Sequence, residues 1–133
     1  MSKEFEERLE RIKLAERATE LAAREHEERE LQKGKDYEDG WREARPRIRG
    51  VMKTVVARLD GFEVQESDTV VSLLSRTRRG SHISYHANPS MRKVALNANL
   101  SGRSVERLLD LGDLSSETDI ERDVGNLLEE LCA

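Results

Sequence analysis

The sequence predicts an α+β fold, with a long N-terminal helix (a possible coiled coil) and then an antiparallel meander of about four strands packed against helices. Residues 3–33 contain no glycine or proline and are dominated by strong helix formers. Residues 62–100 instead alternate apolar and polar side chains in short runs, as half-buried strands do. We therefore expect a charged helical arm over residues 1–40 and an α+β domain over residues 41–133, comprising a helix, the strands and two further helices.

The composition favours one packed domain with an appendage. Hydrophobic residues make up 36% of the 133 residues and charged residues 38%, against roughly 45–50% and 25% in an average globular domain. The single cysteine, Cys132, excludes an intramolecular disulfide and fits a reducing compartment. The N-terminus is too charged for a signal peptide, and no apolar run reaches the roughly 18 residues of a membrane span. A cytoplasmic location and no membrane partner are therefore expected.

The arm carries an apolar stripe with the spacing of a coiled-coil seam. Phe5, Leu9 and Ile12 are separated by four and then three residues, and mostly polar residues continue the same heptad frame. Two interpretations follow: the helix docks on its own domain, or it associates with a second copy to form a homodimer. The residues expected to make the self-association contacts are Phe5, Leu9, Ile12 and Leu21.

Three features indicate how the arm joins the domain. Gly34 and Gly40 predict a helix stop and hinge. Trp41, the only tryptophan, is expected to anchor the arm to the domain, with partner binding as the alternative. Pro46 suits the first turn of a new helix, whose apolar face recurs at helical spacing: Ile48, Val51, Met52, Val55, Val56 and Leu59.

Strands are expected over residues 62–65, 69–75, 81–87 and 92–100. A loop at residues 88–91 would place Tyr85 opposite Val94 and Ile83 opposite Leu96, which puts the apolar residues of both strands on one face.

Two helices, the first of them short, should close the chain. Ser104 is the expected cap of the first, which would carry Val105, Leu108 and Leu109, and the second would follow Ser116. This order of elements is similar to that of RWD-type domains tethered to a coiled coil, although the Tyr-Pro signature of those domains does not occur in this sequence.

The net charge of −4 conceals a basic middle between acidic ends. Residues 41–103 carry 12 basic and 5 acidic side chains, whereas residues 104–133 carry 2 basic and 9 acidic ones. One interpretation is a surface for nucleic acid or another anion. The other is neutralisation of the basic region by the acidic C-terminal helices. The candidate anion contacts are Arg47, Arg49, Lys53, Arg58, Arg76, Arg78, Arg79, Arg92 and Lys93.

No motif in the sequence carries a recognisable chemistry. His82 and His86 would stand about 13 Å apart along a strand, too far for one metal ion. The eight glycines form no phosphate-binding loop. We therefore expect no catalytic residue, metal, cofactor or small-molecule substrate. The sequence predicts a non-enzymatic protein-interaction or regulatory module that self-associates through the arm, or alternatively a nucleic-acid-associated regulator that uses residues 41–103.

Overall fold

A computed structural model describes residues 2–133 and confirms an α+β fold that begins with a long helix. Contacts divide the chain into an N-terminal unit, which ends at Asp36, and a C-terminal unit from Tyr37 to Ala133. The order of elements is α1 (Lys3–Arg58), β1 (Phe62–Glu66), β2 (Val70–Ser75), β3 (His82–Asn88), β4 (Lys93–Leu100), β5 (Arg103–Leu109), the 3-10 helix η1 (Leu111–Leu114) and α2 (Glu117–Leu131).

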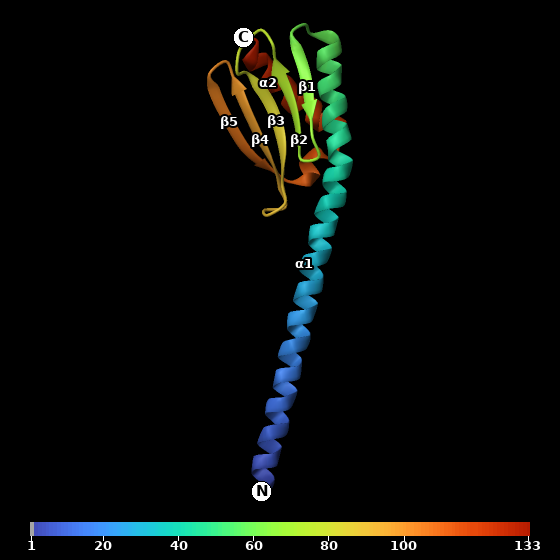
Figure 1. Ribbon diagram of the computed structural model, residues 1–133, viewed down its shortest axis with the longest axis vertical. Coiled ribbons are helices and arrows are strands. Elements are labelled where there is room, and N and C mark those ends of the chain that lie inside the picture. Colours follow the sequence, from blue (N-terminus) through green and yellow to red (C-terminus); the bar gives the residue numbers. More distant parts are fainter. Residues whose placement is uncertain (1) are drawn as a thin grey trace. The chain divides into compact units, whose positions relative to one another are not determined.

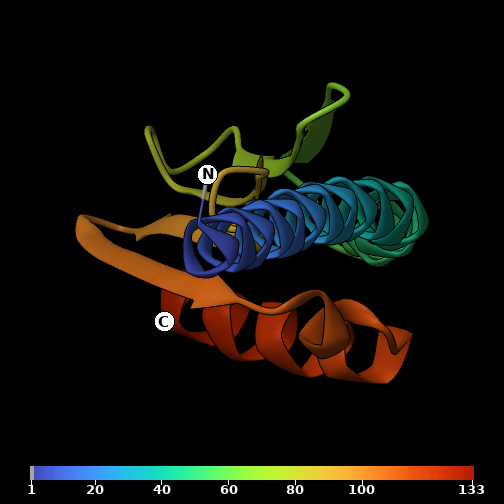
Figure 2. The ribbon, with the colours of Figure 1, turned by 90° about the horizontal axis from the view of Figure 1, so that it is seen from below.

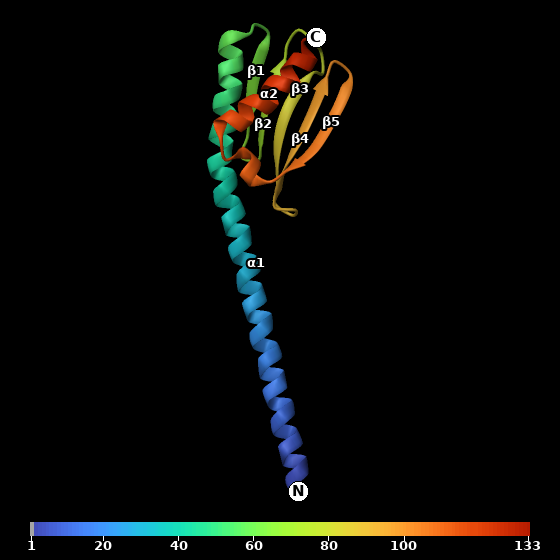
Figure 3. The same ribbon diagram turned by 180° about the vertical axis from the view of Figure 1, so that it is seen from behind.

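The five strands form one antiparallel sheet in chain order, β1-β2-β3-β4-β5 (Figure 1). Each strand pairs with the next one along the chain, which makes the sheet a simple meander. Helix α2 crosses one face of this sheet (Figure 3) and lies along one side of the strands when the unit is viewed from below (Figure 2).

The core lies between that face of the sheet and the two helices. Alternate residues of the strands point into it, as the period of two requires, and α1 and α2 each contribute residues at helical spacing. The buried residues of the strands include Val71, Leu73, Ile83, Tyr85, Val94, Leu96 and Ala98. Those of the helices include Trp41, Ala44, Ile48, Met52, Ile120, Val124, Leu127 and Leu131.

Helix α1 continues without interruption through Gly34, Gly40 and Pro46, so the predicted stop and the predicted new helix start were wrong. The buried residues of α1 run at helical spacing from Tyr37 to Met52, across both positions. Burial of this continuous face offsets the roughly 3 kcal/mol that proline costs inside a helix. Gly40 has a packing role, because a Cβ atom there would lie 2.7 Å from Cδ1 of Leu111.

Residues 103–109 form strand β5, not the predicted short helix, so the sheet has five strands and one α-helix follows it. The spacing of Val105, Leu108 and Leu109 suggested a helix, but the turn between β4 and β5 indicates a strand. Ser101 and Gly102 have φ angles of 57° and 99°, and two successive positive φ angles are typical of a tight two-residue hairpin. The element order that resembled RWD-type domains is therefore not the observed one.

The β3–β4 hairpin has a register two residues away from the predicted one. Tyr85 faces Leu96, and Ile83 faces Ala98. The side chain of Asn88 closes the turn, because its Oδ1 accepts hydrogen bonds from Ser90 Oγ at 2.8 Å and from the Met91 N–H at 3.2 Å. A shift of two residues preserves the side on which each side chain lies, so the predicted apolar face is still the core face.

Two buried tyrosines of the C-terminal unit differ in how their hydroxyl groups are satisfied. The Tyr37 hydroxyl donates to the Lys93 carbonyl at 2.6 Å and accepts from the Asn88 N–H at 2.9 Å, so it ties α1 to both sides of the β3–β4 turn. The Tyr85 hydroxyl is fully buried and has no hydrogen-bond partner among the described residues.

This contrast predicts opposite responses to the same substitution. Tyr37→Phe should lower the free energy of unfolding by about 1–3 kcal/mol, because it leaves a backbone N–H and a carbonyl without their partner. Tyr85→Phe should be neutral or stabilising, because it removes an unsatisfied buried group. Urea unfolding of the two variants beside the unmodified chain measures both effects. Equal losses in the two variants would contradict the assignment.

Candidate interaction surfaces

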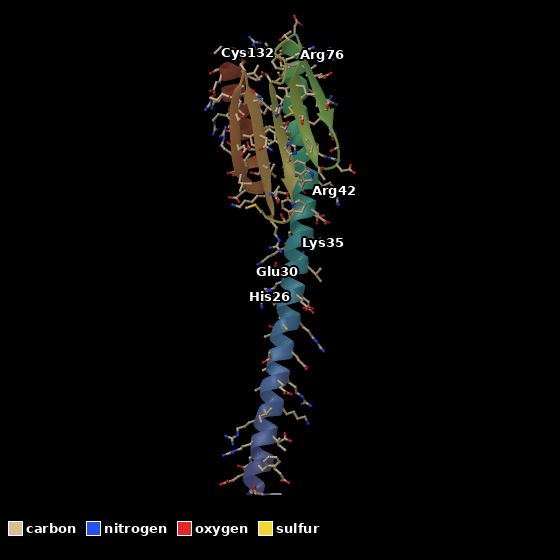
Figure 4. All side chains as sticks on the ribbon, turned by 60° about the vertical axis from the view of Figure 1, so that its left-hand side comes forward. His26, Glu30, Lys35, Arg42, Arg76 and Cys132 are labelled. Atoms are coloured by element: carbon tan, nitrogen blue, oxygen red, sulfur yellow. The ribbon has the colours of Figure 1, made fainter. Side chains whose placement is uncertain are left out.

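The apolar stripe of the N-terminal unit is exposed. Phe5, Leu9 and Ile12 retain 49%, 45% and 55% of their accessible surface. Residues three and four apart lie on the same side of a helix, so these side chains form one continuous strip. A single helix has no core, and the other residues of the N-terminal unit do not bury the strip. Figure 4 shows polar side chains such as His26, Glu30 and Lys35 on the same helix.

Leu21 does not belong to this strip. It follows Ile12 by nine residues, or about two and a half helical turns, which places it on the opposite side of the helix. It instead continues a second stripe with Leu14 and Ala18, again at a spacing of four and three residues. The four residues expected to make one self-association contact therefore divide between two sides. Plotting the sequence on a helical wheel is enough to separate Leu21 from Phe5, Leu9 and Ile12.

Trp41 lies in the core of the C-terminal unit rather than on its surface. Its indole N–H donates to the Asp68 carbonyl at 2.8 Å, which joins α1 to the turn between β1 and β2. Beside it, Arg45 pairs with both Asp68 and Glu66. Trp41 also lines a recess of about 370 Å³ whose other walls include Arg45 and Asp68. The burial and the hydrogen bond of Trp41 are those of a packing residue.

Five of the nine candidate anion contacts already have a partner: Arg92, and four residues whose partners lie within the C-terminal unit. Side-chain nitrogens of these four residues lie close to carboxylate or carbonyl oxygens, and most of the partners belong to β1 and to the segment around η1 rather than to α2. The pairs are Arg49 with Glu66 at 3.0 Å, Arg76 with Glu63 at 3.2 Å, Lys93 with Asp110 at 3.4 Å, and Arg47 with the Leu114 carbonyl at 3.4 Å.

Helix α2 contributes to the charge balance through a pair that the sequence analysis missed. Arg103, in the edge strand β5, donates to Glu130 near the end of α2 at 2.7 Å. This hydrogen bond lowers the pKa of the Glu130 carboxyl and raises the pKa of the Arg103 guanidinium. The missed β5 strand explains the omission, because only its hairpin brings Arg103 beside α2.

The rest of the basic region forms a smaller surface. The side chains of Lys53, Arg58, Arg78 and Arg79 make no hydrogen bond or ion pair within residues 2–133, whereas Arg92 has a partner. The turn that carries Arg78 and Arg79 lies beside the end of α1, because the Arg76 N–H donates to the Gly61 carbonyl at 2.6 Å. Figure 4 shows Arg76 and Cys132 at this end of the C-terminal unit.

The sheet face opposite the core is polar and carries His82 and His86. A row of small polar residues crosses it between them, in which Ser72 Oγ and Ser84 Oγ lie 2.8 Å apart and Asn97 faces Ser84 from β4. His82 Nδ1 lies 3.1 Å from the Gly80 carbonyl oxygen and is directed to the backbone. No group of three metal-ligating side chains gathers here or elsewhere in the part of the chain that the structure describes.

Comparison with known proteins gives no relative. The chain matches no family model, no curated protein and no solved structure. Within residues 2–133, no helix combines the length and the apolar character needed to cross a bilayer.

The buried Tyr85 hydroxyl predicts a pH dependence of stability. Burial raises the pKa of Tyr85, Asp123 raises it further, and Arg107 opposes both. A pKa that is higher in the folded state than the usual value of about 10 stabilises the fold below pH 10, and this stabilisation is lost as the pH rises further. The free energy of unfolding should therefore fall above about pH 10, by up to about 1.4 kcal/mol per pH unit for each such group.

Urea unfolding at neutral and alkaline pH measures this slope, with Tyr85→Phe as the control. In the variant, the free energy of unfolding should fall with pH only as far as other groups cause it to fall. One of these groups is Tyr37, because burial raises its pKa as well. The same slope in the variant and the unmodified chain would show that Tyr85 does not contribute.

Proposed function

We propose that this protein is a non-enzymatic protein-interaction module that associates with a second copy of itself through its N-terminal helix. The observation that carries the proposal is the exposed strip of Phe5, Leu9 and Ile12 on a helix without a core of its own. Isolated helices are marginally stable in water and normally depend on packing of an apolar face. Intermolecular pairing of this strip would supply that packing.

The structure of the C-terminal unit supports the proposal that the N-terminal helix binds a partner and does not serve to complete the core. This unit has its own sheet, two covering helix segments and a buried core that draws no residue from the chain before Tyr37. The long charged helix is therefore not needed to complete that core. An additional contact, outside the fold of one chain, would account for apolar residues at coiled-coil spacing in this helix.

Leu9→Glu should weaken the association at least about tenfold. Each dimer would contain two such sites, and burial of one leucine contributes about 1.5–3 kcal/mol when complete. Sedimentation equilibrium of the full chain over a range of concentrations gives the dissociation constant, and circular dichroism checks that the helix persists.

Leu14→Glu is the matched control, because it places the same charge on the same helix but on the opposite side. This variant should associate as the unmodified chain does. A monomer at all concentrations for the unmodified chain would refute the proposal, and equal weakening by both variants would refute the assignment to the Phe5 strip.

A role in nucleic-acid binding is a second candidate, favoured by the clustering of Arg78 and Arg79 beside the end of α1, where Arg58 also lies. If these residues bind phosphates, affinity for a labelled duplex should fall steeply with salt, and Arg78→Glu with Arg79→Glu should abolish it. Fluorescence anisotropy across a salt series measures this. Arg49→Glu is the control, because its partner Glu66 already engages this guanidinium. No binding at low salt would exclude the candidate.

A further inference from the structure

The charged residues beside the apolar strip distinguish between the two directions in which helices can pair, and this inference rests on the proposed self-association. In heptad terms, Phe5 and Ile12 occupy d positions and Leu9 an a position. Glu6 and Lys13 then occupy the flanking e positions, and Arg8 occupies a g position. None of these three charged side chains makes a hydrogen bond or ion pair within residues 2–133, so all are available to a partner.

A parallel pair brings like charges together. In parallel coiled coils a g residue lies beside the e residue of the next heptad on the other helix. Arg8 of each copy would therefore lie beside Lys13 of the other, and symmetry makes this contact occur twice. The next a position is Glu16, which in a parallel pair in register would face Glu16 of the other copy inside the seam.

An antiparallel pair brings opposite charges together. The a residues then pack against d residues of the other helix, and e residues lie beside e residues. The register that packs Leu9 against Ile12 of the other copy places Glu6 beside Lys13 of the other copy, again twice. Glu16 no longer meets its own equivalent, because it lies opposite Phe5 of the other copy and can extend its carboxylate towards water.

We propose that two copies of the chain pair antiparallel through residues 2–19, with Leu9 of each copy against Ile12 of the other and with Glu6 paired with Lys13 at both ends. Charge complementarity favours a second copy of the chain as the partner of the strip, because Glu6 and Lys13, which flank the strip in each copy, can pair with one another.

Disulfide trapping tests the direction in the full chain with Cys132→Ser, which removes the exposed native thiol. Glu6→Cys combined with Lys13→Cys should form intermolecular disulfides in an antiparallel pair. Arg8→Cys combined with Lys13→Cys is the matched variant, and it should crosslink only in a parallel pair. Neither pair can close within one helix, because residues five or seven apart lie too far from one another along the axis.

Charge exchange gives an independent measurement without cysteines. Glu6→Lys should raise the dissociation constant about fivefold to tenfold, because two attractive contacts become repulsive, and adding Lys13→Glu should restore it. Arg8→Glu should change the dissociation constant little in an antiparallel pair, but it should strengthen a parallel one.

The outcomes separate this inference from the proposed function. Preferential crosslinking of the Arg8→Cys and Lys13→Cys variant, with a dimer in sedimentation, would overturn the antiparallel direction and leave self-association intact. A dimer in which neither variant crosslinks would show that the pairing uses another surface. A monomer at every concentration would refute both the direction and the self-association on which it rests.

Discussion

The packing of the second part of α1 against the sheet is the contact on which the rest of the C-terminal unit depends. From Tyr37 onward, one side of the helix is buried at nearly every turn, and Ile48 and Met52 are completely enclosed. The five-stranded meander has an apolar face that α2 alone does not cover, because α1 residues make up a substantial part of the same core. This packing also fixes local features of the helix. It maintains the helical conformation through Pro46, and it brings η1 so close that a side chain at position 40 would displace the side chain of Leu111.

The sequence was sufficient for features that depend on a strong periodic pattern. The alternation from residue 62 to residue 100 predicted four strands, and for the last two of them it also predicted the core-facing residues; the structure confirms both. The apolar side chains of residues 69–75 fell on both faces, and the sequence did not decide between them. The errors arose where tertiary contacts override local preference. Val105, Leu108 and Leu109 have a spacing that fits a helix, but the unpaired edge of β4 and the tight turn before residue 103 make this segment a strand. Gly40 and Pro46 are helix breakers in isolation, and only the packing partner shows why the helix continues there.

The candidate surfaces were less predictable, because charge along a sequence does not reveal pairing in space. The basic excess of residues 41–103 indicated an anion-binding surface, yet Glu63 and Glu66 from within the same segment already engage three of its arginines, Arg45, Arg49 and Arg76. Neighbouring antiparallel strands and the adjacent helix bring these glutamates beside arginines that are far away in the sequence. Among the described residues, the expected neutralisation by the acidic C-terminal segment occurs in the pairs of Lys93 with Asp110 and of Arg103 with Glu130. What the sequence could not show is which arginines lack partners, and those are the residues that determine the remaining surface.

The N-terminal unit illustrates why apolar spacing alone does not specify an assembly. The strip of Phe5, Leu9 and Ile12 is short and nearly symmetric about Leu9, so its apolar contacts are similar in either helix direction. Discrimination between two arrangements is a difference between two free energies, and repulsive contacts contribute to that difference as much as attractive ones do. In the proposed pair, the lysine at position 13 would therefore have two effects, since it would oppose Arg8 in the parallel direction and attract Glu6 in the antiparallel one. The second stripe, on the opposite side of the helix, cannot contact the same partner helix. A pair formed through the strip of Phe5, Leu9 and Ile12 would thus leave Leu14 and Leu21 uncovered in both copies. The proposed assembly therefore depends on which of the two stripes pairs, and not only on the presence of apolar residues.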